Sequence, residues 1–269
     1  MKNNVRAILL TVAASALLAP QAGAQANDPI NTDRPDVVES SAVVGPGRFQ
    51  IETSFASERN DFEGLRTTTR TTPTLLRYGL SETTELRLET DGFTQRQSSD
   101  IASGTSTRTR GFSDVAVGVK WHTHDGDEAK GTPGIAWLLH ADLSTGSQEF
   151  RGDGVRPSLR MSAEWDLPHD LSLGVMPGLL VDTNSDGHRF VAGLLAVTMS
   201  KSWNDAFRTF IEVAGQRLTS DTNGGSVVTC DLGAAYLLTR STQVDVAIMR
   251  GVTRYAPDLL WTVGLSTKF

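Results

Sequence analysis

The sequence predicts an all-β protein, a transmembrane antiparallel up-and-down β-barrel of about 12 strands. Stretches with an apolar residue at every second position recur from residue 48 to the end of the chain, and this is the period of a strand with one apolar face. Aromatic residues gather near the ends of these stretches. The last stretch runs to the final residue, and closing a barrel with it removes the edge that an open sheet would expose.

The final stretch, Asp258–Phe269, shows the alternation most clearly. The residues that share the parity of the terminal Phe269 are Leu259, Trp261, Val263 and Leu265. Bacterial outer-membrane barrels are similar in this respect, because their last strand commonly ends in Phe after apolar residues at this spacing, and the barrel-assembly machinery reads that pattern. We therefore expect Trp261, Val263, Leu265 and Phe269 to form an assembly signal, although Thr267 departs from the pattern. A soluble strand that ends in Phe is the alternative.

Residues 1–24 have the composition of a secretory signal peptide. Lys2 and Arg6 precede an apolar run over residues 7–19, and the small residues Ala22-Gly23-Ala24 follow it. The apolar run is too short for a membrane-spanning helix. No cysteine follows the expected cleavage site, which argues against a lipid anchor. An amphipathic first helix of the mature protein is the alternative.

Residues 25–47 are rich in Pro, Asp, Ser and Gly and have no sustained period. We expect an irregular periplasmic or lumenal segment here, followed by one barrel domain over residues 48–269. No uninterrupted apolar run of about 20 residues occurs after residue 24, so no helix is expected to cross a bilayer. The mean hydropathy of -0.20 does not argue against a membrane, because transmembrane strands are amphipathic.

Charge and cysteine content exclude several classes of partner. The net charge is -6 and the sequence has no block of like charge, which argues against nucleic acid as a partner. Cys230 is the single cysteine and cannot form an internal disulfide; its parity predicts an inert thiol that faces lipid. The chain has no P-loop, G-x-G-x-x-G or paired-Cys motif, so we expect no cofactor.

The alternation divides the chain into the expected barrel strands. These are Arg48–Arg59, Arg66–Tyr78, Glu85–Asp91, Phe112–Trp121, Ile135–Leu143, Val155–Asp166, Leu171–Asp182, Arg189–Ser200, Phe207–Gln216, Val227–Leu238, Gln243–Gly251 and Asp258–Phe269. The alternation does not show which side chains of Arg66–Tyr78 face inward, because this stretch is rich in Thr and contains Pro73. Arg189–Ser200 is apolar on both parities, which also fits a short buried helix, but its neighbours favour a strand.

The aromatic residues fall at two depths, as the two interfaces of a bilayer require. The strands that run toward the side of the chain ends finish at or near Tyr78, Trp121, Trp165, Trp203, Tyr236 and Phe269. The opposite rim contains Phe55, Phe93, Phe112, Phe190, Tyr255 and Trp261. A soluble β-sandwich, the alternative fold, has no reason to sort its aromatic residues by depth. Trp137, in mid-strand, does not fit either belt.

Four stretches resemble one known family. They are Asn31–Thr53 (NTDRPDVVESSAVVGPGRFQIET), Arg77–Thr90 (RYGLSETTELRLET), Gly111–Trp121 (GFSDVAVGVKW) and Ala256–Phe269 (APDLLWTVGLSTKF). Together they are similar to an outer-membrane transporter family described for the meta pathway of phenol degradation. The resemblance implies a β-barrel in a Gram-negative outer membrane that passes small molecules, aromatic or hydrophobic ones among them. It implies no catalytic residues.

If the apolar parity faces lipid, the polar parity lines the lumen. The expected lumen-lining residues are Glu85, Arg87, Glu89, Asp114, Lys120, His140, Asp142, Arg156, Arg160, Glu164, Asp182, Arg208, Glu212, Asp231, Asp245 and Lys268. One hypothesis is a wet pore whose mixed charges set its selectivity. The alternative is that these charges pair across the lumen and fill it, giving a closed structural or receptor-like barrel. Outer-membrane lipid, the assembly machinery and a small-molecule solute are the expected partners.

The motif Asp33-Arg34-Pro35-Asp36 is a candidate plug. If this segment folds into the lumen, Asp33, Arg34 and Asp36 are placed to pair with charges of the wall, and Arg156 and Arg160 are the expected partners. A periplasmic tail is the alternative.

The chain offers little for catalysis or metal binding. His140, Asp142 and Ser144 share one strand face, but successive members lie about 7 Å apart, beyond the reach of a catalytic triad. No G-x-S-x-G motif occurs, so we expect no enzyme, with an outer-membrane hydrolase as the alternative. The histidines and carboxylates of residues 122–128 fit a solvated turn better than a metal site. We therefore expect no bound metal.

Overall fold

The computed structural model describes residues 29–269. The expected signal peptide and the start of the irregular segment lie outside this range. Over the described range the secondary structure consists of strands and two short 3-10 turns, η1 (Glu128–Lys130) and η2 (Asp221–Asn223). None of the helical segments in this range is long and apolar enough to cross a membrane.

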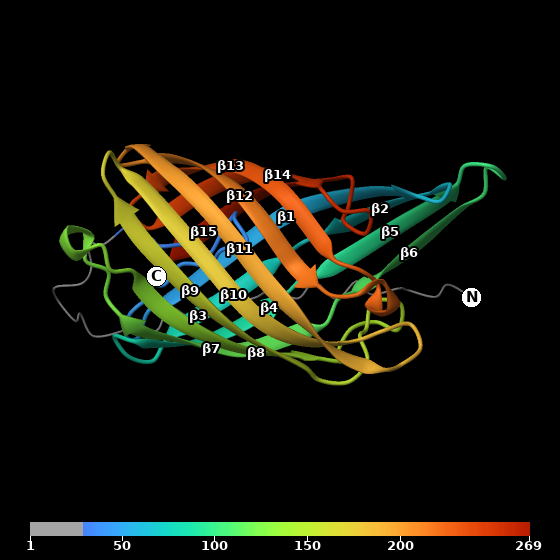
Figure 1. Cartoon of the computed structure of the whole chain (residues 1–269), viewed down its shortest axis with the longest axis horizontal. Helices are drawn as coiled ribbons and strands as arrows, with labels where there is room; N and C mark the ends of the chain where they lie inside the picture. The colour runs from blue at the N-terminus through green and yellow to red at the C-terminus, as the bar shows by residue number, and fades with distance from the viewer. Residues whose placement is uncertain (1–28) are drawn as a thin grey trace, which may run out of the picture.

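Fifteen strand segments form one continuous antiparallel sheet (Figure 1). They are β1 (Phe49–Phe62), β2 (Leu65–Thr71), β3 (Thr74–Gly79), β4 (Thr84–Thr90), β5 (Phe93–Asp100), β6 (Ser106–Phe112), β7 (Val115–His124), β8 (Gly134–Leu143), β9 (Arg156–Leu167), β10 (Leu171–Thr183), β11 (Arg189–Asn204), β12 (Phe207–Leu218), β13 (Val227–Thr239), β14 (Thr242–Gly251) and β15 (Leu259–Lys268). The pairs β2/β3, β4/β5 and β6/β7 are each one long strand with a break, so the barrel has 12 strands, as predicted.

Pairing between the last strand and the first closes the barrel. β15 lies antiparallel to β1, in a register that runs from Gln50 opposite Lys268 to Arg59 opposite Leu259. At the end of this seam the amide of Phe269 donates to the carbonyl oxygen of Phe49 at 2.8 Å. A closed ladder satisfies the backbone groups that lipid cannot. The predicted up-and-down barrel is therefore confirmed.

The three breaks lie side by side and bend the sheet. Backbone hydrogen bonds continue across them, because the amide of Thr72 donates to Asp91 at 3.0 Å and that of Ser113 to Gly92 at 2.9 Å. Gly92 has φ +65°, and a Cβ atom there would lie 2.5 Å from the carbonyl oxygen of Thr72. The bend therefore requires glycine at this position.

Beyond the breaks, β2, β5, β6 and the end of β1 project from the barrel as an extension of the sheet (Figure 1). We call this the projecting sheet. The sequence pattern did not predict β5 or most of β6. Their residues are largely Thr, Ser, Gln and Arg on both parities, because both faces of the sheet lie outside the hydrocarbon. Without an apolar face, the period of two is lost.

The outside of the barrel is apolar and the inside is mostly polar. Ile211 on β12 is 64% exposed and Leu232 beside it on β13 is 58% exposed. Arg77, Glu85 and Lys120, on the opposite parity of their strands, are fully buried. The apolar side chains therefore do not meet in a core between two sheets, and the soluble β-sandwich is excluded. Their exposure is what a membrane-spanning wall requires.

The aromatic belts form contacts between neighbouring strands. The ring centroids of Phe55 and Trp261 lie 5.6 Å apart, and those of Phe93 and Phe112 lie 5.8 Å apart. Trp137, which the sequence pattern left in mid-strand, is paired in register with Trp121. It belongs to the belt near the chain ends, because β8 begins at Gly134 and a register shift follows at His122/His124.

The expected assembly-signal residues lie on the outside of the closing strand. Trp261, Val263, Leu265 and Phe269 are all exposed, and the ring of Phe269 stacks on Phe49 with centroids 6.4 Å apart. Cys230 is also exposed, on the lipid-facing side of β13. Recognition of the last strand by the assembly machinery stays a prediction.

Replacing Ile211 by Arg should destabilise the barrel by about 2–4 kcal/mol, because the charge would enter hydrocarbon. Denaturant unfolding in lipid vesicles measures this change. Thr222→Arg, in the exposed turn η2, is the control and should have little effect. Equal effects of the two substitutions would contradict the assignment of the outer face.

Candidate functional site

Residues 29–47, which we call the lumenal segment, form neither helix nor strand, and most of residues 30–44 are buried inside the barrel. The segment is tied to the turn between β13 and β14, because the amide of Ile30 donates to Arg240 at 2.7 Å. At its other end the amide of Val44 donates to the Glu85 carboxylate at 2.9 Å. The segment therefore crosses the lumen from one side of the wall to the other before it enters β1.

Asp33 is the centre of the contacts between the lumenal segment and the wall. Its carboxylate lies 2.5 Å from the Arg87 guanidinium, 2.8 Å from the Lys120 ammonium and 3.4 Å from the Arg77 guanidinium. All four side chains are buried. An isolated buried charge is very costly, so each of these cations requires an anion nearby.

The strands supply further partners for Arg77. Its guanidinium lies 2.8 Å from Glu85 and 3.0 Å from Glu52, and it also donates to the carbonyl oxygens of Asn31 and Ala42. Arg77 thus joins three strands of the wall to both ends of the lumenal segment. The planar fork of donors on an arginine suits such a position.

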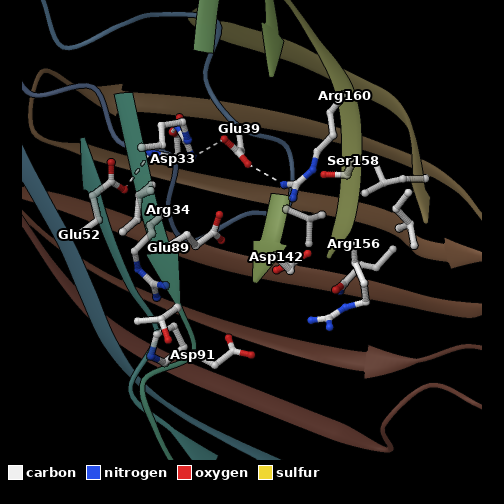
Figure 2. Close-up of a pocket in the computed structure, with 18 of the residues that line it drawn as sticks. Asp33, Arg34, Glu39, Glu52, Glu89, Asp91, Asp142, Arg156, Ser158 and Arg160 are labelled. Carbon is white, nitrogen blue, oxygen red and sulfur yellow. Dashed lines mark hydrogen bonds and ion pairs between the residues drawn. The ribbon is translucent and has the colours of Figure 1, made fainter. Parts of the chain in front are cut away.

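Glu39 makes a second ionic contact with the wall. Its carboxylate lies 2.6 Å from Arg87 and 2.8 Å from Arg160 (Figure 2). The hydroxyl of Ser162 donates to the Glu39 carbonyl oxygen, and the amide of Ser41 donates to Glu164 at 2.5 Å. The segment is therefore held along its length against the β3–β9 side of the barrel.

Toward β12–β15 the contacts are fewer. Glu212 accepts hydrogen bonds from the amides of Val37 at 2.8 Å and Val38 at 2.9 Å. Asp36 faces Arg208 at 3.6 Å, beyond normal hydrogen-bond distance. The Arg34 guanidinium lies 3.3 Å from Asp245 and donates to Thr262 at 2.8 Å.

One side of the lumen is apolar. Val38 packs on the buried side chains of Met176, Ala196 and Ala214, which come from β10, β11 and β12, and Leu194 packs beside them. We call these inward-facing residues of β10–β12 the apolar wall. It explains why Arg189–Ser200 is apolar on both parities: one face meets lipid and the other meets the lumenal segment. The expected strand is present here, and the short-helix alternative is wrong.

One cavity lies on each side of the lumenal segment. The outer cavity, of about 430 Å³, is bordered by the charged residues Glu89, Asp142 and Arg156 (Figure 2). Leu180 and Leu194, of β10 and β11, also line it. The inner cavity, of about 270 Å³, lies toward the chain ends between the segment and β9–β14. Asp36 lines both cavities, and Arg208 lines the inner one. The Asp36–Arg208 pair therefore lies between them.

The expected partners of the candidate plug residues were wrong. Asp33 pairs with Arg77, Arg87 and Lys120 and does not contact Arg156 or Arg160. Charge alone points to Arg156 and Arg160, whereas pairing also depends on the depth at which the segment crosses the lumen. Arg160 instead contacts Glu39, as described above.

Arg156 contacts Asp114 at 2.9 Å, at the outer end of the wall. Asp114 also accepts hydrogen bonds from the amides of Gly146 and Gly152, so it anchors the loop between β8 and β9. Asp182 faces Arg217 at 3.8 Å near the same end.

The remaining residues expected in the lumen lie on the inward parity of their strands. Glu85, Arg87, Lys120, His140, Glu212, Asp231 and Asp245 are buried, and Glu89, Asp142, Arg160, Glu164 and Arg208 border a cavity. Lys268, near the chain end, borders a third cavity together with Gln50. Their contribution to selectivity stays a prediction. The pattern missed Arg77, because the facing of its Thr-rich strand was not set, and it missed Glu52, although the parity of Phe49 and Ile51 marks Glu52 as inward.

The residues considered for catalysis do not come together. Ser144 donates its hydroxyl hydrogen to the carbonyl oxygens of Gly152 and Gly154 in the outer loop. His140 is buried, and its Nδ1 lies 3.4 Å from Glu89. At the end of β7, His122 contacts Asp125 at 2.8 Å, and residues 29–269 contain no group of three potential metal ligands.

Comparison with known proteins identifies the family. The family model described as "Putative MetA-pathway of phenol degradation" matches residues 32–269. The chain belongs to this family. The match begins in the lumenal segment, so this phenol-degradation family includes the segment as well as the barrel. A sequence comparison with curated proteins gives no match.

Two solved structures of outer-membrane proteins are similar to this chain. An outer-membrane channel of Pseudomonas putida F1 is 11% identical, with a TM-score of 0.60, and the alignment covers 86% of this chain and 98% of that chain. The NanC porin is 11% identical, with a TM-score of 0.49, over 82% of this chain and 100% of that chain. The first likeness shows that this chain has the fold of an outer-membrane barrel.

Replacing Asp33 by Ala should release the lumenal segment, because three buried cations would lose a shared anion. A loss of about 3–5 kcal/mol is typical when one partner of a buried ion pair is removed. Hydrogen exchange of peptides from residues 29–47 should then accelerate on the order of a hundredfold or more. Asp36→Ala, which removes a carboxylate facing one arginine, is the control. Equal acceleration in both variants would contradict the central position of Asp33.

Proposed function

We propose that the protein is an outer-membrane channel that passes small molecules, aromatic or hydrophobic ones among them. The observation that carries this proposal is the pair of cavities that meet at Asp36 beside an apolar wall. In this proposal the two cavities belong to one route through the barrel, and the lumenal segment lies between them. Membership of the phenol-degradation family supports the same class of solute.

The two sides of the lumen suit a weakly polar solute. Ligand sites are commonly apolar clefts with a few polar groups that fix orientation. The outer cavity is more polar than this, because charged residues such as Asp142 and Arg160 make up much of its lining, and Leu180 and Leu194 supply its apolar side. A small aromatic molecule can place its ring against the apolar wall and direct a hydroxyl group toward the charged side.

The lumenal segment acts as a plug in this proposal. Its ionic contacts with the β3–β9 side fix it in place, and its few contacts with Arg208, Glu212 and the apolar wall leave the route along β10–β13. The alternative function is a closed structural or receptor-like barrel. In that case the segment and the paired charges seal the lumen permanently.

We further propose that the barrel is not an enzyme. The hydrolase alternative needs a nucleophile and a base within about 3 Å of one another. Ser144 is engaged by the outer loop, and His140 faces Glu89. Neither arrangement activates a nucleophile.

Deleting residues 27–45 should raise the single-channel conductance in planar bilayers, because the obstruction inside the lumen is removed. Heat-modifiable gel migration serves as the control that the shortened barrel has folded. Equal conductance with and without the segment would contradict the plug. If neither protein conducts in any salt tested, the closed barrel is favoured.

Replacing Leu194 by Asn should reduce the flux of phenol into proteoliposomes severalfold, because apolar contact area in the outer cavity is lost. The flux of glycerol should change much less. The matched control is Val191→Asn, three residues earlier on β11, where the side chain is exposed on the outside. The same loss of phenol flux in both variants would count against a route along the apolar wall.

A further inference from the structure

The projecting sheet carries a row of arginines on the face that continues the lipid-facing wall. Directly paired residues of antiparallel strands lie on the same face. The aromatic pair Phe93 and Phe112 marks the rim on this face. In the next row away from the barrel, Arg70 is paired with Gln95, and Gln95 with Arg110.

One row further out on the same face, Gln97 is paired with Arg108. This end of the barrel is opposite the chain ends, and in bacterial barrels that end faces the exterior. The arginines therefore lie just above the interface of the outer leaflet, at the depth of its headgroups.

Three of these arginines have no carboxylate partner within residues 29–269. Arg108 donates to the Gln97 side chain at 3.2 Å and Arg110 to that of Gln95 at 3.0 Å, and both are exposed. Arg70 is also exposed and forms no ion pair with a described residue. By contrast, Arg59 and Arg66 both contact Asp61 at 2.8 Å. An uncompensated cluster on one face attracts anions.

An apolar hollow lies directly beneath Arg70. It has a volume of about 300 Å³ and is lined by Phe55, Phe93, Thr71, Thr72, Arg70 and Gln95. Its floor consists of aromatic rings of the outer belt, and its upper edge consists of the arginine and the glutamine. Such a junction of apolar and cationic groups matches the junction of acyl chains and a phosphate in a lipid.

We propose that this face binds a phosphorylated glycolipid of the outer leaflet, lipopolysaccharide, through its lipid A part. Arg70, Arg108 and Arg110 hold the phosphates, and an acyl chain occupies the hollow between Phe55 and Phe93. Charge complementarity selects this occupant, since outer-leaflet lipid A carries two phosphates at the depth of three unpaired arginines. The other face of the sheet is different, because Arg96 there lies over the ring of Phe150, 5.3 Å from its centroid.

Native mass spectrometry of the purified barrel in detergent tests this site with bis-phosphorylated lipid A as the probe. Arg70→Gln should weaken binding roughly fivefold, and the triple variant with Arg108→Gln and Arg110→Gln on the order of a hundredfold, given the usual contribution of a basic residue near an anionic lipid surface. Arg96→Gln, on the opposite face, should bind as the wild type does. Heat-modifiable migration of each variant establishes that it is folded.

Two further probes separate the sources of the phosphate. Dephosphorylated lipid A should bind as weakly to the wild type as lipid A binds to the triple variant, and phosphatidylglycerol should bind more weakly than lipid A. The proposal is overturned if the folded triple variant retains wild-type affinity. It is also overturned if Arg96→Gln loses as much as Arg70→Gln, or if phosphatidylglycerol binds as tightly as lipid A. Conductance does not enter this test, so the result is independent of the channel function.

Discussion

Charge compensation between the lumenal segment and the barrel wall is the constraint on which the interior depends. The wall places Arg77, Arg87 and Lys120 close together inside a narrow barrel, where isolated cations are very costly. Glu52 and Glu85 of the wall compensate part of this charge, Asp33 of the segment contacts all three cations at once, and Glu39 adds a second anion from the segment. The segment is therefore an integral part of the lumen, and its position follows from the charges that the strands present.

The side of the lumen formed by β10–β12 has a different composition. Small and apolar side chains of β10–β12 face inward, where Val38 packs on them, and Glu212 and Arg208 of β12 supply the polar contacts with the segment. The result is an interior that is charged along most of the wall and apolar in one patch on β10–β12. The proposed passage of weakly polar solutes depends on this division, because a uniformly charged lumen would favour ions and a uniformly apolar one would exclude water.

The sequence predicted the fold better than it predicted the contacts. Alternation identifies strands wherever one face meets lipid, as in β9 and β15, and fails in β5 and β6, where both faces meet water. Inward parity also identifies most charged residues of the lumen. The pattern does not show which of these residues pair, because partners across a barrel depend on strand stagger and on the depth of the lumenal segment. Asp33 contacts Arg87 rather than Arg156 for that reason.

The projecting sheet ends in a strand whose outer backbone edge is open along most of its length. β6 pairs with β5 alone, and only Phe112 at its base accepts a hydrogen bond from the loop residue Ser147. An open edge with apolar side chains would recruit a strand from a neighbouring molecule and start aggregation. The side chains of β6 are almost entirely Ser, Thr and Arg, so two barrels in one membrane can meet at their outer ends without joining sheets.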